Sequence, residues 1–130
     1  MSRWDSATPL GNVRGTGSAK EGGDHWLRER MTSIALFLLG LWLVASLLWL
    51  PDLGRRTVIE WLSSPLAAVP MILFVIAAFV HAIDGLKVAI DDYVHDHANH
   101  FMVNTFVWLV GIGAGALALF SLLRVAFGAE

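Results

Sequence analysis

The sequence predicts an all-α integral membrane protein with three transmembrane helices in an up-down-up bundle. Its 130 residues are 56% apolar and only 15% charged, whereas soluble proteins average about 25% charged residues. Three apolar runs cover residues 31–50, 61–83 and 101–123. Each run has about 20 residues or more, enough to cross the roughly 30 Å hydrocarbon core as a helix. Strands are excluded because three open strands would leave unpaired backbone groups in lipid.

We expect the chain to divide into a polar arm, residues 1–24, and a three-helix membrane-anchor domain, residues 25–130. The arm is rich in glycine and serine and lacks the apolar core of a cleaved signal peptide. The expected spans cover about 29–50, 64–90 and 100–125.

The first helix opens with Asp24 and the residues that follow it. Trp26 is placed as an anchor in the membrane interface, and Arg28 and Arg30 lie at the level of the headgroups. The connection over residues 51–57 is short, so the first two spans are expected to be antiparallel neighbours.

Ser64 and Pro65 form a helix-start signal, an N-cap followed by proline at the first helical position. Pro70 either kinks this second helix or marks its true start. A polar connection over about 91–100 leads to the third helix, where Gly111 and Gly115 have the spacing that lets membrane helices approach closely. Generic helix packing is favoured for these glycines over contact with a cofactor.

Lysine and arginine set the expected orientation. A cluster of five precedes or opens the first span, namely Arg3, Arg14, Lys20, Arg28 and Arg30. This cluster predicts a cytoplasmic N-terminus. The connection between the second and third spans is then also cytoplasmic, and the C-terminus is outside.

The composition limits the possible chemistry. The net charge of −2 gives no indication of nucleic-acid binding, and the chain has no cysteine. Disulfides, thiolate metal sites, covalent haem attachment through cysteine and iron–sulfur ligation by this chain are therefore excluded. Any redox cofactor held here must be bound through histidine.

His81 is the one histidine inside the predicted spans, since His25, His95, His97 and His100 lie at or beyond the interface. An ionisable residue within a span is costly and is therefore a candidate functional residue. One interpretation is a polar residue hydrogen-bonded across the bundle. The other is an axial ligand to haem iron, for which imidazole is the usual protein ligand. A second axial histidine would then come from another subunit.

Gly85 and Asp92 follow His81 on one helical stripe. A flat, bulky ligand can lie along this stripe, with Gly85 leaving room for a macrocycle. If this ligand is haem, its propionates would approach Arg28 and Arg30, because guanidinium groups pair well with carboxylates.

Other polar residues of this region have simpler interpretations. Asp84 and Lys87 lie three residues apart, and mutual neutralisation near the interface is the favoured role for both. The cluster His95, His97 and His100 has no clean helical pair of ligands, so a solvated loop is favoured over a metal site.

Asp92 and Tyr93 form a polar mouth where the second helix leaves the lipid. A phenol beside a carboxylate can bond a quinone carbonyl and relay protons. Composition alone favours the other interpretation, a tyrosine of the aromatic belt beside a helix-end charge.

The stretch from His81 to Tyr93 resembles the signature of the D-type hydrophobic membrane-anchor subunits of succinate dehydrogenase, respiratory complex II. The shared pattern is a histidine, a glycine four residues later and an Asp-Tyr pair eleven and twelve residues later. Residues 15–22 and 26–34 are similar to the proteobacterial form. In the C-type sister subunit Arg-His usually follows the glycine, whereas Leu86 and Lys87 follow it here.

The resemblance implies that the chain holds haem b together with the C subunit. It implies an axial role for His81 and a ubiquinone site bordered by Tyr93 and Asp92. It places near the haem propionates Arg30, Arg28 and His25. The implied partners are the C membrane-anchor subunit, the iron–sulfur subunit and the flavoprotein subunit, in the bacterial inner membrane, with no nucleic acid.

The leading function is therefore that of a membrane anchor of succinate:ubiquinone oxidoreductase, with no catalysis by this chain alone. One alternative is a transporter or channel subunit that relays protons through Asp84 and His81. The others are a structural anchor without haem and the anchor of a fumarate reductase.

Overall fold

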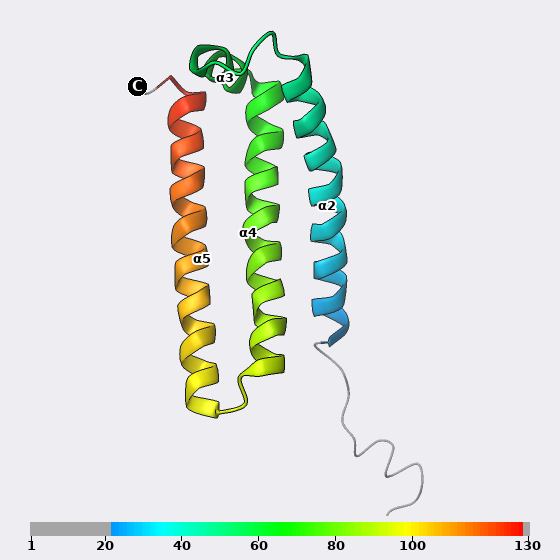
Figure 1. Cartoon of the computed structure of the whole chain (residues 1–130), viewed down its shortest axis with the longest axis vertical. Coiled ribbons are helices and arrows are strands. Elements are labelled where there is room, and N and C mark those ends of the chain that lie inside the picture. Colours follow the sequence, from blue (N-terminus) through cyan, green and yellow to red (C-terminus); the bar gives the residue numbers. More distant parts are fainter. Residues whose placement is uncertain (1–21, 129–130) are drawn as a thin grey trace, which may run out of the picture.

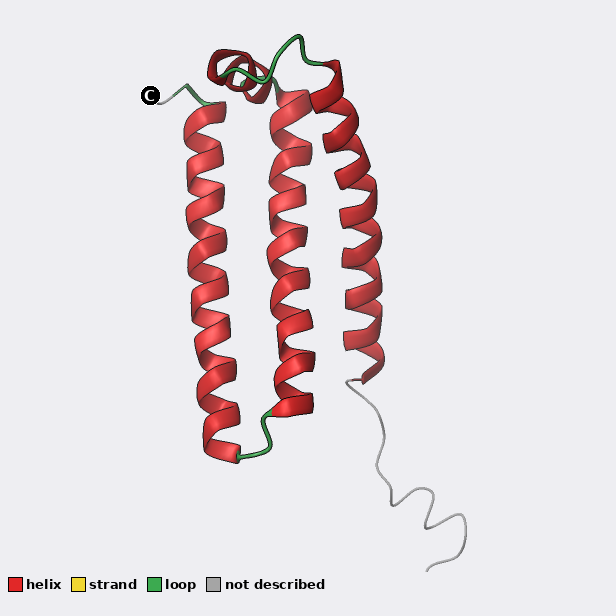
Figure 2. Cartoon of the chain, in the orientation of Figure 1, coloured by secondary structure: helices red, strands yellow, loops and turns green. Residues whose placement is uncertain are grey.

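All regular structure in the described part of the chain is helical (Figures 1 and 2). The computed structural model describes residues 22–128, apart from the side chain of His25. Its helices are α2 (Gly22–Trp49), α3 (Arg55–Leu62), α4 (Pro65–Tyr93) and α5 (His97–Ala126). The three long ones, α2, α4 and α5, are long and apolar enough to cross a membrane. The predicted all-α membrane protein with three spans is confirmed. Most of the predicted polar arm, residues 1–21, lies outside the described residues.

The long helices extend beyond most ends of the predicted spans. They have 28, 29 and 30 residues, which at 1.5 Å of rise per residue gives about 42–45 Å. A hydrocarbon core is about 30 Å thick. The helix ends therefore reach the headgroup region, where water and headgroups can satisfy polar side chains.

The three long helices alternate in direction and form a layer with α4 in the middle (Figure 1). Helices α2 and α5 each pack against α4 and make no contact with one another. Both faces of the layer therefore stay open, and few side chains are buried. The buried apolar residues of the described part are Ala67, Ala68, Ile83, Ile90 and Leu122.

The connection between α2 and α4 contains a helix that the sequence analysis does not predict. The loop expected over residues 51–57 is wrong at its end, because α3 begins at Arg55. Helix α3 lies beside the end of α5 and the start of α4 (Figure 1). Trp61 of α3 stacks on Trp42 of α2, with ring centroids 5.9 Å apart. The sequence does not distinguish α3 as a separate helix, because Trp61 is continuous with the apolar run over residues 61–83 that was assigned to the second span.

Ser64 and Pro65 start α4 as predicted, as N-cap and first helical residue. The Ser64 side chain makes no capping bond. Its backbone carbonyl accepts hydrogen bonds from the amides of Ala67 and Ala68 instead. Pro70 lies inside α4, so it does not mark the helix start.

Helices α4 and α5 approach closely at two glycines. A Cβ added at Gly111 would lie 2.6 Å from Cγ1 of Ile83, and one at Gly115 would lie 3.2 Å from the Phe79 ring. Carbon atoms pack best at about 3.5–4.0 Å, so the helices are as near as the glycines allow. These distances confirm the predicted packing role of the pair.

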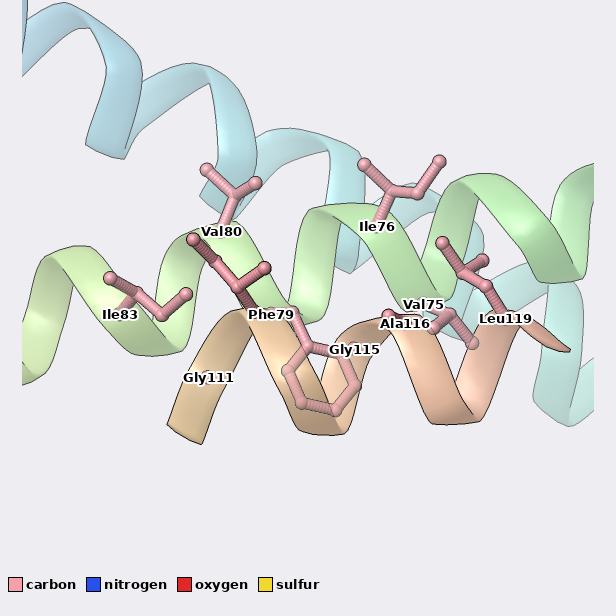
Figure 3. A pocket seen from close by; sticks show the side chains of 10 residues that line it. Val75, Ile76, Phe79, Val80, Ile83, Gly111, Gly115, Ala116 and Leu119 are labelled. Atoms are coloured by element: carbon pink, nitrogen blue, oxygen red, sulfur yellow. The ribbon is translucent and has the colours of Figure 1, made fainter. Parts of the chain in front are cut away.

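An apolar groove of about 280 Å³ runs along this α4–α5 seam (Figure 3). Phe79 and Ile83 line it from α4, and Gly111, Gly115 and Leu119 line it from α5. His81 does not line it, and none of its lining side chains is polar. The groove therefore belongs to helix packing and offers nothing that would orient a polar ligand.

We predict that Gly111→Ala destabilises the protein by about 1–3 kcal/mol, the usual cost of overpacking a close contact. Ile83 would have to move to admit the new methyl group. Gly113→Ala is the matched control, because a Cβ at Gly113 meets nothing within 4 Å. Thermal unfolding of the detergent-extracted protein measures both. Equal loss of stability in the two variants would contradict the prediction.

Candidate functional site

One unbroken helix carries the stripe that the sequence predicts. Helix α4 runs from Pro65 to Tyr93, so His81, Gly85 and Asp92 lie on one side of it within about three turns. His81 is half-buried, whereas Gly85 and Asp92 are exposed. The stripe therefore begins beside the packed part of the layer and continues onto an uncovered surface.

His81 is tied to α2 by a hydrogen bond. Its Nδ1 lies 3.1 Å from Oγ1 of Thr32. The same hydroxyl lies 3.0 Å from the backbone oxygen of Arg28 and 3.1 Å from that of Glu29. Within the described residues Nε2 of His81 has no hydrogen-bond partner. One ring nitrogen is thus held in place while the other remains available.

Asp84 is a buried carboxylate paired with an arginine of the neighbouring helix. It is 3% exposed. Arg28 donates to both of its oxygens, from Nε at 2.7 Å and from a terminal nitrogen at 3.0 Å. Bidentate geometry of this kind is the strongest form of the arginine–carboxylate pair. The ion pair lies about one turn from the contact between His81 and Thr32.

The pairing of Asp84 with Lys87 expected from their spacing is wrong. Asp84 points to α2, and the Lys87 ammonium instead lies 4.5 Å from the centroid of the Trp108 ring of α5. A cation over an aromatic face is an attractive contact. Asp84 and Lys87 therefore tie α4 to two different neighbours.

The two arginines expected near haem propionates lie on different sides of α2. Arg28 faces α4, whereas the guanidinium of Arg30 lies 5.1 Å from the centroid of the Trp26 ring. Arg28 and Arg30 are two positions apart, which separates them by about 200° around the helix axis, so they lie on different sides of α2. The side chain of His25 lies outside the described residues.

Asp92 and Tyr93 lie at the last turn of α4, at the same end of the layer as the start of α2 (Figure 1). Both are exposed, Tyr93 to 83%. Their carboxylate and phenol groups are therefore accessible at this end of the layer, and Tyr93 lies about 18 Å of helix rise from His81.

Of the three histidines expected in the second connection, His95 lies in it, and His97 and His100 lie in the first turn of α5. His100 Nε2 lies 2.7 Å from a carboxylate oxygen of Asp91. Asp96 caps α5 by accepting a hydrogen bond from the Asn99 amide at 3.0 Å. Residues 22–128 contain no group of three or more side chains positioned to hold a metal ion.

The surroundings of His81 suit a flat macrocycle that brings its own metal ligands. A Cβ added at Gly85 meets nothing within 4 Å, so the helix surface one turn from His81 is open to a ring. Haem iron is such a metal, since the porphyrin supplies four ligands and imidazole commonly completes the set. The donor set and the open surface therefore fit haem.

Thr32 and the partner of Asp84 were missed by the sequence analysis. Both depend on how α2 is rotated about its axis, and its residues 34–45 are apolar on every side, so they do not indicate which face meets α4. The available signal was weak. Arg28 and Thr32 are four residues apart and so share one helical face, as Glu29 and Ser33 also do.

The family model for succinate dehydrogenase/fumarate reductase transmembrane subunits matches residues 5–123. Three similar proteins bear the name succinate dehydrogenase hydrophobic membrane anchor subunit. The one from Rickettsia bellii is 35% identical over 91 residues, which cover 70% of this chain and 73% of that protein. The one from Rickettsia conorii is 31% identical over 108 residues, covering 82% and 83%. The one from Paracoccus denitrificans is 29% identical over 122 residues, covering 94% of each.

We predict that Arg28→Gln destabilises the protein by about 3 kcal/mol, because it leaves the Asp84 carboxylate buried without its cation. Asp84→Asn should cost less, since the Arg28 side chain is 52% exposed and can turn to water. Thermal unfolding of the detergent-extracted protein measures both values. A larger loss from Asp84→Asn than from Arg28→Gln would refute this account.

Arg56→Gln is the control for losing an arginine–carboxylate pair at the surface. Arg56 donates to Glu60 at 2.7 Å within α3, and both side chains are exposed. The hydrogen bond and charge of Glu60 raise the pKa of Arg56 above its ordinary value, yet an arginine is protonated at any physiological pH in either case. Exposed pairs contribute little, so we expect no measurable change.

Proposed function

The chain belongs to the family of succinate dehydrogenase/fumarate reductase transmembrane subunits, and we propose that it holds haem b with a sister C subunit and borders a ubiquinone-reduction site. It is a multi-pass membrane anchor, as its three long apolar helices and its anchor-subunit relatives show. One observation carries the haem proposal. His81 lies within a membrane-length helix with Nδ1 bonded to Thr32 and with Nε2 unengaged by the described residues.

The number of histidines supports a ligand from a second subunit. His97 and His100 lie in the first turn of α5, and His95 lies in the connection before it. His25 is near the start of α2. His81 is thus the single histidine well inside a span, and low-spin b-type haem commonly takes two. The second axial histidine is therefore proposed to come from the C subunit.

Haem would supply one-electron chemistry to this anchor when bound. The chain's own residues would hold and orient it. His81 offers Nε2 to the iron, and Gly85 leaves the adjacent helix surface clear. Arg30 is the arginine proposed for a propionate, because it makes no ion pair among residues 22–128. Arg28 has an exposed edge left for the same purpose, and His25 remains a further candidate.

Tyr93 and Asp92 are proposed to border the quinone. The Tyr93 hydroxyl can donate a hydrogen bond to a quinone carbonyl, and the Asp92 carboxylate beside it can orient that hydroxyl or pass on a proton. Quinone reduction consumes protons, so a site at the membrane surface has the supply that it needs. Both residues are exposed in this chain, which leaves them free to face a partner or a ligand.

The proposed partners follow from the anchor role. The C subunit would cover the face of the layer beside His81. An iron–sulfur subunit would dock near Tyr93, with the flavoprotein subunit beyond it. We propose the bacterial inner membrane, with the start of α2 on the cytoplasmic side because of its arginines.

The proton-relay alternative has little support. Both oxygens of Asp84 are bound by Arg28, so proton uptake there would first require breaking the ion pair. The anchor of a fumarate reductase remains a second candidate, because the family model spans both enzymes. The direction of turnover by the purified complex separates these two enzymes.

We predict that His81→Ala removes haem b from the purified complex or sharply lowers its content, because the other histidines of this chain lie at the ends of the long helices or in the connection between them. A reduced-minus-oxidised absorption spectrum, normalised to complex, measures the loss. His95→Ala is the matched control and should retain haem, since His95 is exposed in the connection between α4 and α5. An unchanged spectrum and axial ligation in His81→Ala would refute the haem proposal.

We predict that Tyr93→Phe lowers the rate of quinone reduction about ten- to a hundredfold. The ring still fills its place, but a hydrogen bond to a quinone oxygen that gains charge is lost, worth roughly 1.5–3 kcal/mol. Succinate oxidation with a soluble artificial acceptor is the control and should be unaffected. Equal loss of both activities would indicate failed assembly, and full quinone reductase activity would remove Tyr93 from the site.

A further inference from the structure

The hydroxyl of Thr32 has more acceptors around it than it has hydrogens. Its oxygen lies 3.0 Å and 3.1 Å from the backbone oxygens of Arg28 and Glu29, and 3.1 Å from Nδ1 of His81. A threonine hydroxyl has one hydrogen to donate and two lone pairs that accept. The direction of the bond to His81 therefore depends on where that hydrogen goes.

The two backbone oxygens decide the direction. If Thr32 donated to His81, both carbonyls would face only lone pairs of the hydroxyl at close range. If Thr32 donates into its own helix, as threonine in a helix commonly does, its oxygen is left to accept. Nδ1 of His81 must then carry a hydrogen and donate it. In the neutral ring, Nε2 is left unprotonated with a lone pair.

We propose that Thr32 is a positioning residue that fixes His81 in the tautomer whose Nε2 binds iron. This inference rests on the proposed haem role of His81 and adds Thr32 as a further residue of that site. The hydrogen bond also restricts rotation of the ring, because Nδ1 is held toward α2 while Nε2 is directed away from it.

The ion pair of Arg28 with Asp84 sets the helix separation that this hydrogen bond requires. Arg28 precedes Thr32 by four residues on α2, and Asp84 follows His81 by three on α4. Residues at these spacings share a helix face. The two contacts are thus neighbours on one seam, and the bidentate ion pair holds the rotation and distance of α2 at the level of His81.

A hydrogen bond donated by the second nitrogen of a metal-binding histidine makes the ligand more basic. A more basic ligand favours ferric over ferrous iron. Thr32→Val keeps the shape of the side chain but removes the acceptor. We therefore expect an upward shift in haem midpoint potential and roughly 10–100-fold weaker haem retention.

The experiment uses the assembled complex, with potentiometry, low-temperature electron paramagnetic resonance of the ferric haem and the rate of haem transfer to apomyoglobin as readouts. Thr32→Val and Thr32→Ala should both raise the potential, change the resonance spectrum and speed haem loss. Thr32→Ser should restore wild-type values in all three. A purely structural role of Thr32 would move stability without this hydroxyl-dependent shift in potential.

Ser33→Ala is the matched control. Ser33 donates to the backbone oxygen of Glu29 at 2.7 Å, which is the same kind of bond within the helix, but it makes no hydrogen bond to His81 in the described part of the chain. It should leave all three readouts unchanged. A shift in Ser33→Ala equal to that in Thr32→Val would overturn the proposal, because a hydroxyl within the helix would then suffice.

His81→Ala separates failure of this inference from failure of the haem proposal. If His81→Ala loses haem and Thr32→Val matches wild type, only the role of Thr32 is refuted. If His81→Ala keeps its haem and ligation, the haem proposal falls and the inference falls with it. Loss of assembly in both Thr32→Val and Thr32→Ala would assign Thr32 to folding and would also overturn the proposal.

Discussion

The buried carboxylate of Asp84 is the constraint on which the α2–α4 half of the molecule depends. A charge 3% exposed inside a membrane-length helix cannot be left unpaired, because lipid offers it no solvation. Arg28 is the residue that pairs with it, and this fixes which face of α2 meets α4. Thr32 lies one turn further along that face, so the ion pair also determines what His81 contacts.

The contacts between α4 and α5 differ in kind from those between α2 and α4. Lipid tails are as apolar as a leucine side chain, so burial of apolar surface contributes little to the association of membrane helices. The α4–α5 seam relies on close packing, with Gly111 and Gly115 against Ile83 and Phe79. The α2–α4 seam also packs along its length, and it adds hydrogen bonds near one end, from Arg28 to Asp84 and between Thr32 and His81. His81 lies on the side of α4 that carries these hydrogen bonds to α2.

Length and apolarity were enough to predict the three long helices, and Ser64–Pro65 was enough to place the start of α4, because both signals are local. Asp84 shows where local rules fail. Lys87 lies within reach along the helix, yet a bidentate arginine from another helix is the better partner in a low-dielectric site. Helix α3 was not predicted for a related reason. The apolar run that begins at Trp61 does not reveal that the chain leaves one helix at Ser63 and starts another at Pro65.

The open face beside His81 explains why the candidate site is only half built by this chain. A layer in which α2 and α5 do not touch cannot enclose a macrocycle, and a single histidine cannot supply two axial ligands. The arginines reflect the same division. Arg28 faces α4 and forms an ion pair with Asp84. Arg30 lies on the other side of α2 against the Trp26 ring and forms no ion pair with the described residues. If haem binds as we propose, the chain provides one axial ligand and its orientation, and a partner subunit provides the opposite wall.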